Sequence, residues 1–218
     1  ELFLEAVNLG LFQAISLFVQ YSAWSFFFRV MGQTSQEHLF ISGFSQTILY
    51  LFGFAIEAVS KAAAAIVSNL IGARRYDLIK SVYRAGIRLH CILGVLVGIF
   101  LFLTPDSVWR MFFSGDTAIP DHMFQTLKLS MVWIWLIFFG EALLFLWSGI
   151  LMAFGDSKFL FVVSSISVWV LGIFPAYIAV TVYHQPAHMI CAIASLYYLG
   201  AGLFFYFRVK QRLQDQFQ

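Results

Sequence analysis

The apolar residues of this chain come in continuous blocks, and several of these blocks are long enough to cross a lipid bilayer. A membrane-spanning helix needs about 20 such residues. Of the 218 residues, 61% are hydrophobic and 11% are charged, whereas a soluble domain has about 25% charged residues. The blocks are not the narrow stripes of helices that pack on a soluble core, so we expect lipid around them. The chain is therefore predicted to be an all-α membrane protein.

A window of about 20 residues finds six candidate spans, with a polar loop between the third and the fourth. They cover residues 2–28, 39–71, 81–103, 124–154, 159–182 and 187–207. The second is long enough to tilt or bend near Gly53, and Pro175 is expected to kink the fifth. The spans predict a single domain over residues 1–218, a polytopic bundle of six transmembrane helices. Because the chain begins at Glu1 without an initiator Met, we expect a domain of a longer protein or a half-sized subunit.

Basic residues at the ends of the spans predict the orientation of the bundle. One side carries Arg74, Arg75, Lys80, Arg84, Arg88, Lys158, Arg208, Lys210 and Arg212, whereas the other carries Arg29 and Arg110, with Lys128 close by. Cytoplasmic segments of membrane proteins collect Lys and Arg, so both termini are predicted to lie in the cytoplasm. Two units of this kind in one chain would have the same orientation, as in parallel repeats.

Glu141 is a carboxylate in the middle of the apolar run from Met131 to Phe154, and every residue within four positions of it is apolar or glycine. A charged group at the centre of a membrane helix costs at least about 2.5–3.5 kcal/mol, so it is rarely kept without a function. Its own helix offers no cation nearby, since Lys128 is about 20 Å away along a helix. Glu141 is therefore the candidate site for a proton or a sodium ion. A structural acid, either protonated or paired with Lys61, is the alternative.

Two other polar groups lie inside the spans. Glu57 and Lys61 are four residues apart in the second span, a spacing that favours an ion pair on one helix face. This pair either anchors helix packing or shapes a passage for ions and substrates. Gln13, Ser16 and Gln20 form one stripe on the first span, and such a stripe either binds helices together or lines a cavity.

The sequence offers little support for other classes of protein. The two cysteines, Cys91 and Cys191, fall inside predicted spans and are expected to be small core residues. Neither they nor the histidines have the spacing of a metal site. We find no nucleophile with its base and no glycine loop that could cradle phosphate, so we predict neither an enzyme nor a cofactor. The net charge of +2 comes from residues at membrane boundaries, so no nucleic-acid partner is expected.

Three segments resemble a known transporter family. They are the small-residue run Ala62–Ala73, which ends in an Ile-Gly turn, the glycine stretch Gly149–Asp156, and the Trp…Pro pattern of Ser167–Tyr177. In their order and spacing, the chain resembles the C-terminal six-helix half of multidrug and toxic compound extrusion (MATE) transporters.

This resemblance implies a lobe that works with an N-terminal six-helix lobe, or with a second copy of itself, in the plasma membrane. Such proteins export organic cations or amphipathic drugs by alternating access, in exchange for sodium ions or protons. Several bacterial members use an acid eight residues before the first glycine of the glycine stretch, and Glu141 stands eight residues before Gly149. A second acid of some members corresponds to Leu17 here, so Glu141 is expected to couple alone or with Glu57.

Two alternatives stay open at the level of sequence. One is a flippase for lipids or lipid-linked sugars from the same superfamily, which would use basic cavity residues such as Lys61. The other is a non-transporting or degenerate half that needs a partner.

Overall fold

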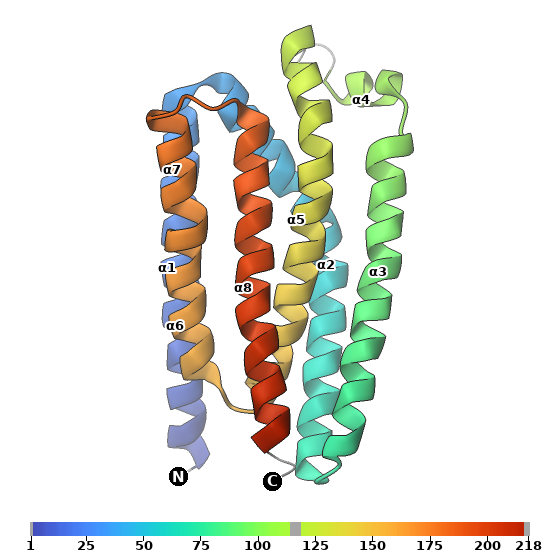
Figure 1. The fold of residues 1–218 in the computed structure, drawn as a ribbon, viewed down its shortest axis with the longest axis vertical. Coiled ribbons are helices and arrows are strands. Elements are labelled where there is room, and N and C mark those ends of the chain that lie inside the picture. The colour runs from blue at the N-terminus through green and yellow to red at the C-terminus, as the bar shows by residue number, and fades with distance from the viewer. Residues whose placement is uncertain (1, 114–118, 216–218) are drawn as a thin grey trace.

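The computed structural model describes residues 2–113 and 119–215, without the side chains of residues 2–6, 8, 9, 12, 13 and 112. All regular secondary structure in these residues is helical. The long helices run side by side along one axis (Figure 1). They are α1 (Leu2–Thr34), α2 (Gln36–Gly72), α3 (Ile79–Leu103), α5 (Asp121–Ala153) and α8 (Ala187–Asp215). Helices α6 (Ser157–Ser167) and α7 (Phe174–Thr181) follow one another in one further long segment, and the short α4 (Asp106–Phe112) lies at the upper end.

Within the described residues, five helical segments are long and apolar enough to cross a membrane. They are Gln36–Gly72, Tyr76–Leu103, Asp121–Ala153, Ser157–Thr181 and Ala187–Asp215. The all-α class is confirmed, and these five segments correspond to the second to sixth predicted spans. Helix α1, with 33 residues, runs beside α6 and α7 (Figure 1).

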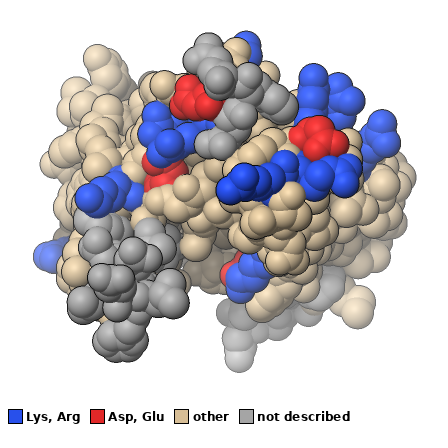
Figure 2. Space-filling view, turned by 90° about the horizontal axis from the view of Figure 1, so that it is seen from below, with Lys and Arg blue, Asp and Glu red and all other residues tan. Residues whose placement is uncertain are grey.

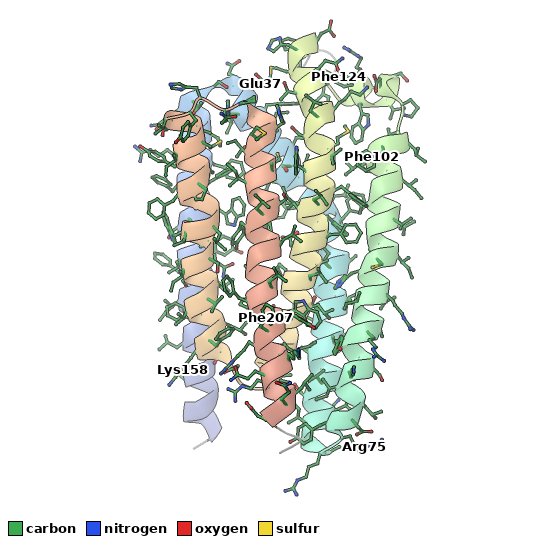
Figure 3. All side chains as sticks on the ribbon, in the orientation of Figure 1. Glu37, Arg75, Phe102, Phe124, Lys158 and Phe207 are labelled. Atoms are coloured by element: carbon green, nitrogen blue, oxygen red, sulfur yellow. The ribbon has the colours of Figure 1, made fainter. Side chains whose placement is uncertain are left out.

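Large apolar side chains cover the outside of the bundle as well as its core. Phe102 and Phe207, which Figure 3 labels, are 47% and 62% exposed. A soluble protein rarely shows large contiguous apolar surfaces of this kind. The outer surface of the bundle therefore suits the lipid environment that the sequence predicts.

Helix α5 lies at the centre and packs most extensively against α8 and α2. Glycines on α5 permit this close packing. A Cβ atom at Gly140 would lie 2.8 Å from Cβ of Tyr198 on α8, and one at Gly149 would lie 2.9 Å from the carbonyl oxygen of Ser60 on α2. Both glycines therefore set how near the neighbouring helices come to the Glu141 segment.

Proline affects the fifth predicted span in a specific way. Val168–Ile173 forms a π-helical segment (η3) between α6 and α7, and Pro175 follows at the start of α7. Proline has no N–H to donate to the carbonyl four residues earlier, that of Leu171, so the regular α-helical pattern is interrupted there. The kink predicted at Pro175 stays a prediction, and the structure has this wider turn just before the proline.

The structure corrects two details of the expected spans and agrees with a third, the tilt of the second span. The polar loop after the third span contains helix α4, whose first residue, Asp106, follows Pro105. Helix α8 continues to Asp215, eight residues beyond the predicted end at 207. Helix α2 stays one continuous helix past Gly53, and its upper part crosses the bundle obliquely (Figure 1).

The two ends of the bundle differ in charge. Lys and Arg side chains gather at the lower end (Figure 2), where Figure 3 labels Arg75 and Lys158. At the upper end, where Figure 3 labels Glu37 and Phe124, two of the basic groups are paired with acids: Arg110 lies 2.8 Å from Asp121 and Lys128 lies 2.9 Å from Asp106. The charge asymmetry predicted from sequence thus exists as a property of the folded bundle.

Candidate coupling site

Glu141 lies in the central helix α5 and contacts α8. The hydroxyl of Tyr198 donates to Oε1 of Glu141 over 3.5 Å. Oε2 of Glu141 is buried and has no hydrogen-bond partner among the described residues. A buried carboxylate oxygen without a partner is costly, so this atom is the natural place for a bound proton or cation.

A small upper cavity of about 30 Å³ lies next to this pair, between α1, α2, α5 and α8. Tyr198 lines it together with Ser42, Ser45, Gln46 and Cys191. The cavity is large enough for a water molecule, which needs about 10–15 Å³ and polar partners. Tyr198 therefore joins the carboxylate of Glu141 to a small polar space on its upper side.

A lower cavity of about 120 Å³ lies on the other side of Glu141, between α1, α5, α6 and α8. Its polar lining consists of Ser16, Gln20, Ser148 and Ser164. Along α5, Ile137 lines the upper cavity, and the lining of the lower cavity begins at Leu144. Glu141 lies between these positions, and Ser148 shares its helix face because it is seven residues, about two turns, further on.

The polar stripe predicted on the first span forms part of this lower cavity. Nε2 of Gln20 donates to Oγ of Ser16 over 3.0 Å, and Ser16 is buried. The Gln13 side chain lies outside the described residues. Leu17, to which the sequence resemblance assigns the position of a second acid, also lines the lower cavity. An acid at this position would therefore share the cavity below Glu141.

The Glu57–Lys61 pair lies elsewhere. Nζ of Lys61 lies 2.7 Å from Oε1 of Glu57, and the two side chains are 75% and 47% exposed. Neither residue lines the upper or the lower cavity. The predicted ion pair is present, and Lys61 is engaged by Glu57, so the structure gives no support to a pairing of Lys61 with Glu141.

Asp156 ends the glycine stretch and joins the α5–α6 turn to α8. Gly155 has a φ of 73°, a conformation that glycine adopts readily. The side chain of Asp156 is 9% exposed and accepts from Nε of Arg208 (2.8 Å) and Nη2 of Arg212 (2.7 Å). Burial alone would raise the pKa of Asp156, but the hydrogen bonds from Arg212 and Arg208 outweigh it and lower the pKa to about 2.

Sequence reasoning missed several of these partners. Tyr198 lies 57 residues from Glu141, and its position in an apolar helix gave no local signal of this contact. Arg208 and Arg212 were counted only as markers of orientation, although both bind Asp156. Among the described residues, no group of three His, Cys, Asp or Glu side chains could hold a metal ion.

Comparisons with known proteins agree with the motifs. The MatE family model matches residues 13–178, which is more than half of the chain. An uncharacterized transporter of Schizosaccharomyces pombe (strain 972 / ATCC 24843) is 33% identical over 87 residues, which is 40% of this chain and 15% of that transporter. The matched segment thus spans a small part of the relative's length. These findings confirm the resemblance read from the sequence, and the chain belongs to the MatE family of membrane transporters.

Proposed function

We propose that this chain is one lobe of a secondary antiporter that exports organic cations or amphipathic drugs, with Glu141 as the site of the coupling proton or sodium ion. One observation carries the proposal: Oε2 of Glu141 is buried without a partner among the described residues, in the central helix. An ionisable group in a membrane helix is by default a functional candidate. Glu141 lies along α5 between the residues that line the upper cavity and those that line the lower cavity, and a small cation would reach it from one of the two.

In this proposal α1 is a sixth span and the lower end of the bundle faces the cytoplasm. Helix α1 is as long as α5, at 33 residues, and lies alongside α6 and α7. It begins at the lower end, where α8 ends and where the basic residues gather (Figures 1 and 2). Cytoplasmic segments collect basic residues, so both termini would be cytoplasmic and the membrane would be the plasma membrane.

Coupling would follow from the change of charge at Glu141. With a proton or sodium ion bound, the site is neutral, and without one it carries a negative charge in a low-dielectric interior. A cationic substrate would stabilise the charged form, so substrate and coupling ion would compete. The two forms would favour different arrangements of this lobe and its partner, which is an N-terminal lobe or a second copy. The carboxylate of Glu141 would accept a proton, or it would coordinate a sodium ion together with the hydroxyl oxygen of Tyr198.

The flippase alternative has less support from the geometry. Pyrophosphate binding at the centre of the bundle would require free cations there, whereas Lys61 is paired with Glu57 and, among the described residues, no Lys or Arg lines the upper or the lower cavity. The second alternative is a non-transporting half that needs a partner, and the exposed apolar faces of the bundle agree with it. It differs from the main proposal only in that it does not transport. Measured transport therefore decides between them.

The proposal is tested with the intact protein in proteoliposomes, by following efflux of a panel of cationic dyes under a sodium or a proton gradient separately. Glu141→Gln should abolish gradient-driven efflux, because an amide cannot exchange a cation. Glu37→Gln, the same change at the upper end of the bundle, is the matched control and should transport normally. Gradient-driven efflux at the wild-type rate from Glu141→Gln would refute the assignment.

A further inference from the structure

A third cavity lies at the lower, basic end of the bundle, away from Glu141. Its volume is about 340 Å³, and it lies between the start of α3, the end of α5 and the last turns of α8. This volume is in the range of small-ligand sites, about 300–1,000 Å³. The residues that line it divide into a cationic group and an aromatic group.

The cationic group consists of Lys80 on α3 and Lys210 on α8. Among the described residues, neither lysine forms an ion pair with a carboxylate. Asp77 also lines the cavity, but its oxygens accept from Arg75 at 3.2 and 3.4 Å. Asp77 is therefore paired with Arg75, which does not line the cavity, and Lys80 and Lys210 leave an excess of positive charge in the lining.

The aromatic group consists of Trp147 and the tyrosines beside it in the lining. The ring of Trp147 lies 5.4 Å from that of Tyr83 and 5.4 Å from that of Tyr206, centroid to centroid. Trp147 is buried, whereas Tyr206 is 38% exposed. Trp and Tyr in membrane proteins are enriched at the level of lipid headgroups. The cavity thus places unpaired ammonium groups beside an amphipathic aromatic wall at one end of a membrane bundle.

We propose that this cavity binds the headgroup of an anionic phospholipid. Lys80 and Lys210 hold its phosphate, and Trp147 and Tyr206 carry the glycerol backbone and the first carbons of an acyl chain. Basic pockets between membrane helices bind anionic headgroups by this chemistry. Free phosphate would pair with the two lysines but would make no contact with the aromatic side chains. A lipid would contact both groups and therefore fits the cavity better. The site lies outside the Glu141 region and does not depend on the transport proposal.

The test uses the intact protein in detergent and native mass spectrometry to count bound lipids. Phosphatidylserine and phosphatidylcholine with the same acyl chains are supplied in equal amounts. Wild-type protein should retain phosphatidylserine selectively. The double variant Lys80→Gln/Lys210→Gln should bind it roughly 25-fold more weakly, from about fivefold for each lysine at the surface. Arg74→Gln/Lys158→Gln, which removes the same charge from the same end outside the cavity, is the matched control and should bind normally.

Three results would overturn the proposal. One is equal retention of phosphatidylserine and phosphatidylcholine by the wild type. Another is equal binding by the cavity variant and the control variant. The third is displacement of the lipid by millimolar inorganic phosphate, which would make free phosphate the ligand. Both lysines are exposed, so the variants should fold, and a melting temperature within a few degrees of wild type verifies this. The single variants Lys80→Gln and Lys210→Gln should each give an intermediate loss.

Discussion

The hydroxyl of Tyr198 on α8 lies 3.5 Å from Oε1 of Glu141 on α5. Gly140, next to Glu141 in sequence, makes this approach possible because a Cβ atom there would lie 2.8 Å from Cβ of Tyr198. Tyr198 also lines the upper cavity. The pair therefore links the acid in α5 to a space between four helices, and it holds the carboxyl group in one orientation.

Tyr198→Phe tests this positioning role, since it removes the hydroxyl and keeps the ring. A net hydrogen bond of this kind contributes about 1 kcal/mol and stabilises the charged carboxylate, so without it we expect a coupling proton to bind roughly fivefold more tightly. The measurement is the cation concentration that gives half-maximal efflux in proteoliposomes. Tyr197→Phe is the control, because Tyr197 is equally buried next to Tyr198. An unchanged half-maximal concentration in Tyr198→Phe would contradict the role.

Glu141 should reduce the stability of the fold. Its Oε2 atom is buried without a partner among the described residues, and such a group costs about 1–3 kcal/mol. Glu141→Met replaces it with an apolar side chain of similar length. We expect this variant to unfold at a higher temperature in detergent while losing coupled efflux. A lower unfolding temperature would show that the carboxyl group stabilises the bundle.

Much of the fold follows from the sequence because lipid imposes a simple rule: a span must be apolar and about 20 residues long. The same rule singles out Glu141, since a charge in such a segment is conspicuous. The Glu57–Lys61 pair is also local, because four residues along a helix fix which side chains meet.

The remaining features depend on how helices face one another, and helix faces in lipid are weakly encoded. Apolar residues surround α5 on all sides, so periodicity does not show which side meets Tyr198. Asp156 and its arginines are more than 50 residues apart in sequence and meet only after α8 packs against α5. Helix α4 was missed because seven residues, Asp106–Phe112, are too few for a span.

Gly149 should be intolerant of a larger side chain. A Cβ atom there would lie 2.9 Å from the backbone oxygen of Ser60, so Gly149→Ala forces α5 and α2 apart. Overpacking of this kind costs about 1–3 kcal/mol, measured as a fall in the unfolding temperature. Gly53→Ala is the control, since nothing lies within 4 Å of its Cβ position. Because alanine favours a helix over glycine by about 1 kcal/mol, this control should be neutral or stabilising.

Because Asp156 is paired with two arginines, the folded protein should lose stability in acid. Its pKa falls from 3.8 to about 2 in the folded chain. A group with a lowered pKa stabilises the fold above its unfolded pKa, and the contribution disappears as the pH falls through the folded value. With allowance for screening at the end of the bundle, about 1–2 kcal/mol should be lost between about pH 5 and pH 2.

Thermal unfolding of Asp156→Asn across this pH range is the test. The variant should be less stable than wild type near neutral pH, and its stability should depend less on pH between about 5 and 2. Asp77→Asn removes an exposed carboxylate at the same end and serves as the control. If wild type and Asp156→Asn lose stability in parallel as the pH falls, the arginine contacts do not account for the acid sensitivity.

Substitutions of Glu57 and Lys61 should have non-additive effects on stability, because the two side chains form an ion pair. Both side chains lie on a face of α2 that this lobe leaves exposed. Lys61→Gln leaves Glu57 charged and alone, which costs about 2.5–3.5 kcal/mol on membrane insertion scales. Glu57→Gln/Lys61→Gln removes both charges and should recover most of this loss. The measurement is the amount of folded protein in the membrane fraction, together with its unfolding temperature. If the double variant is as poor as Lys61→Gln, then Lys61 acts through a partner other than Glu57.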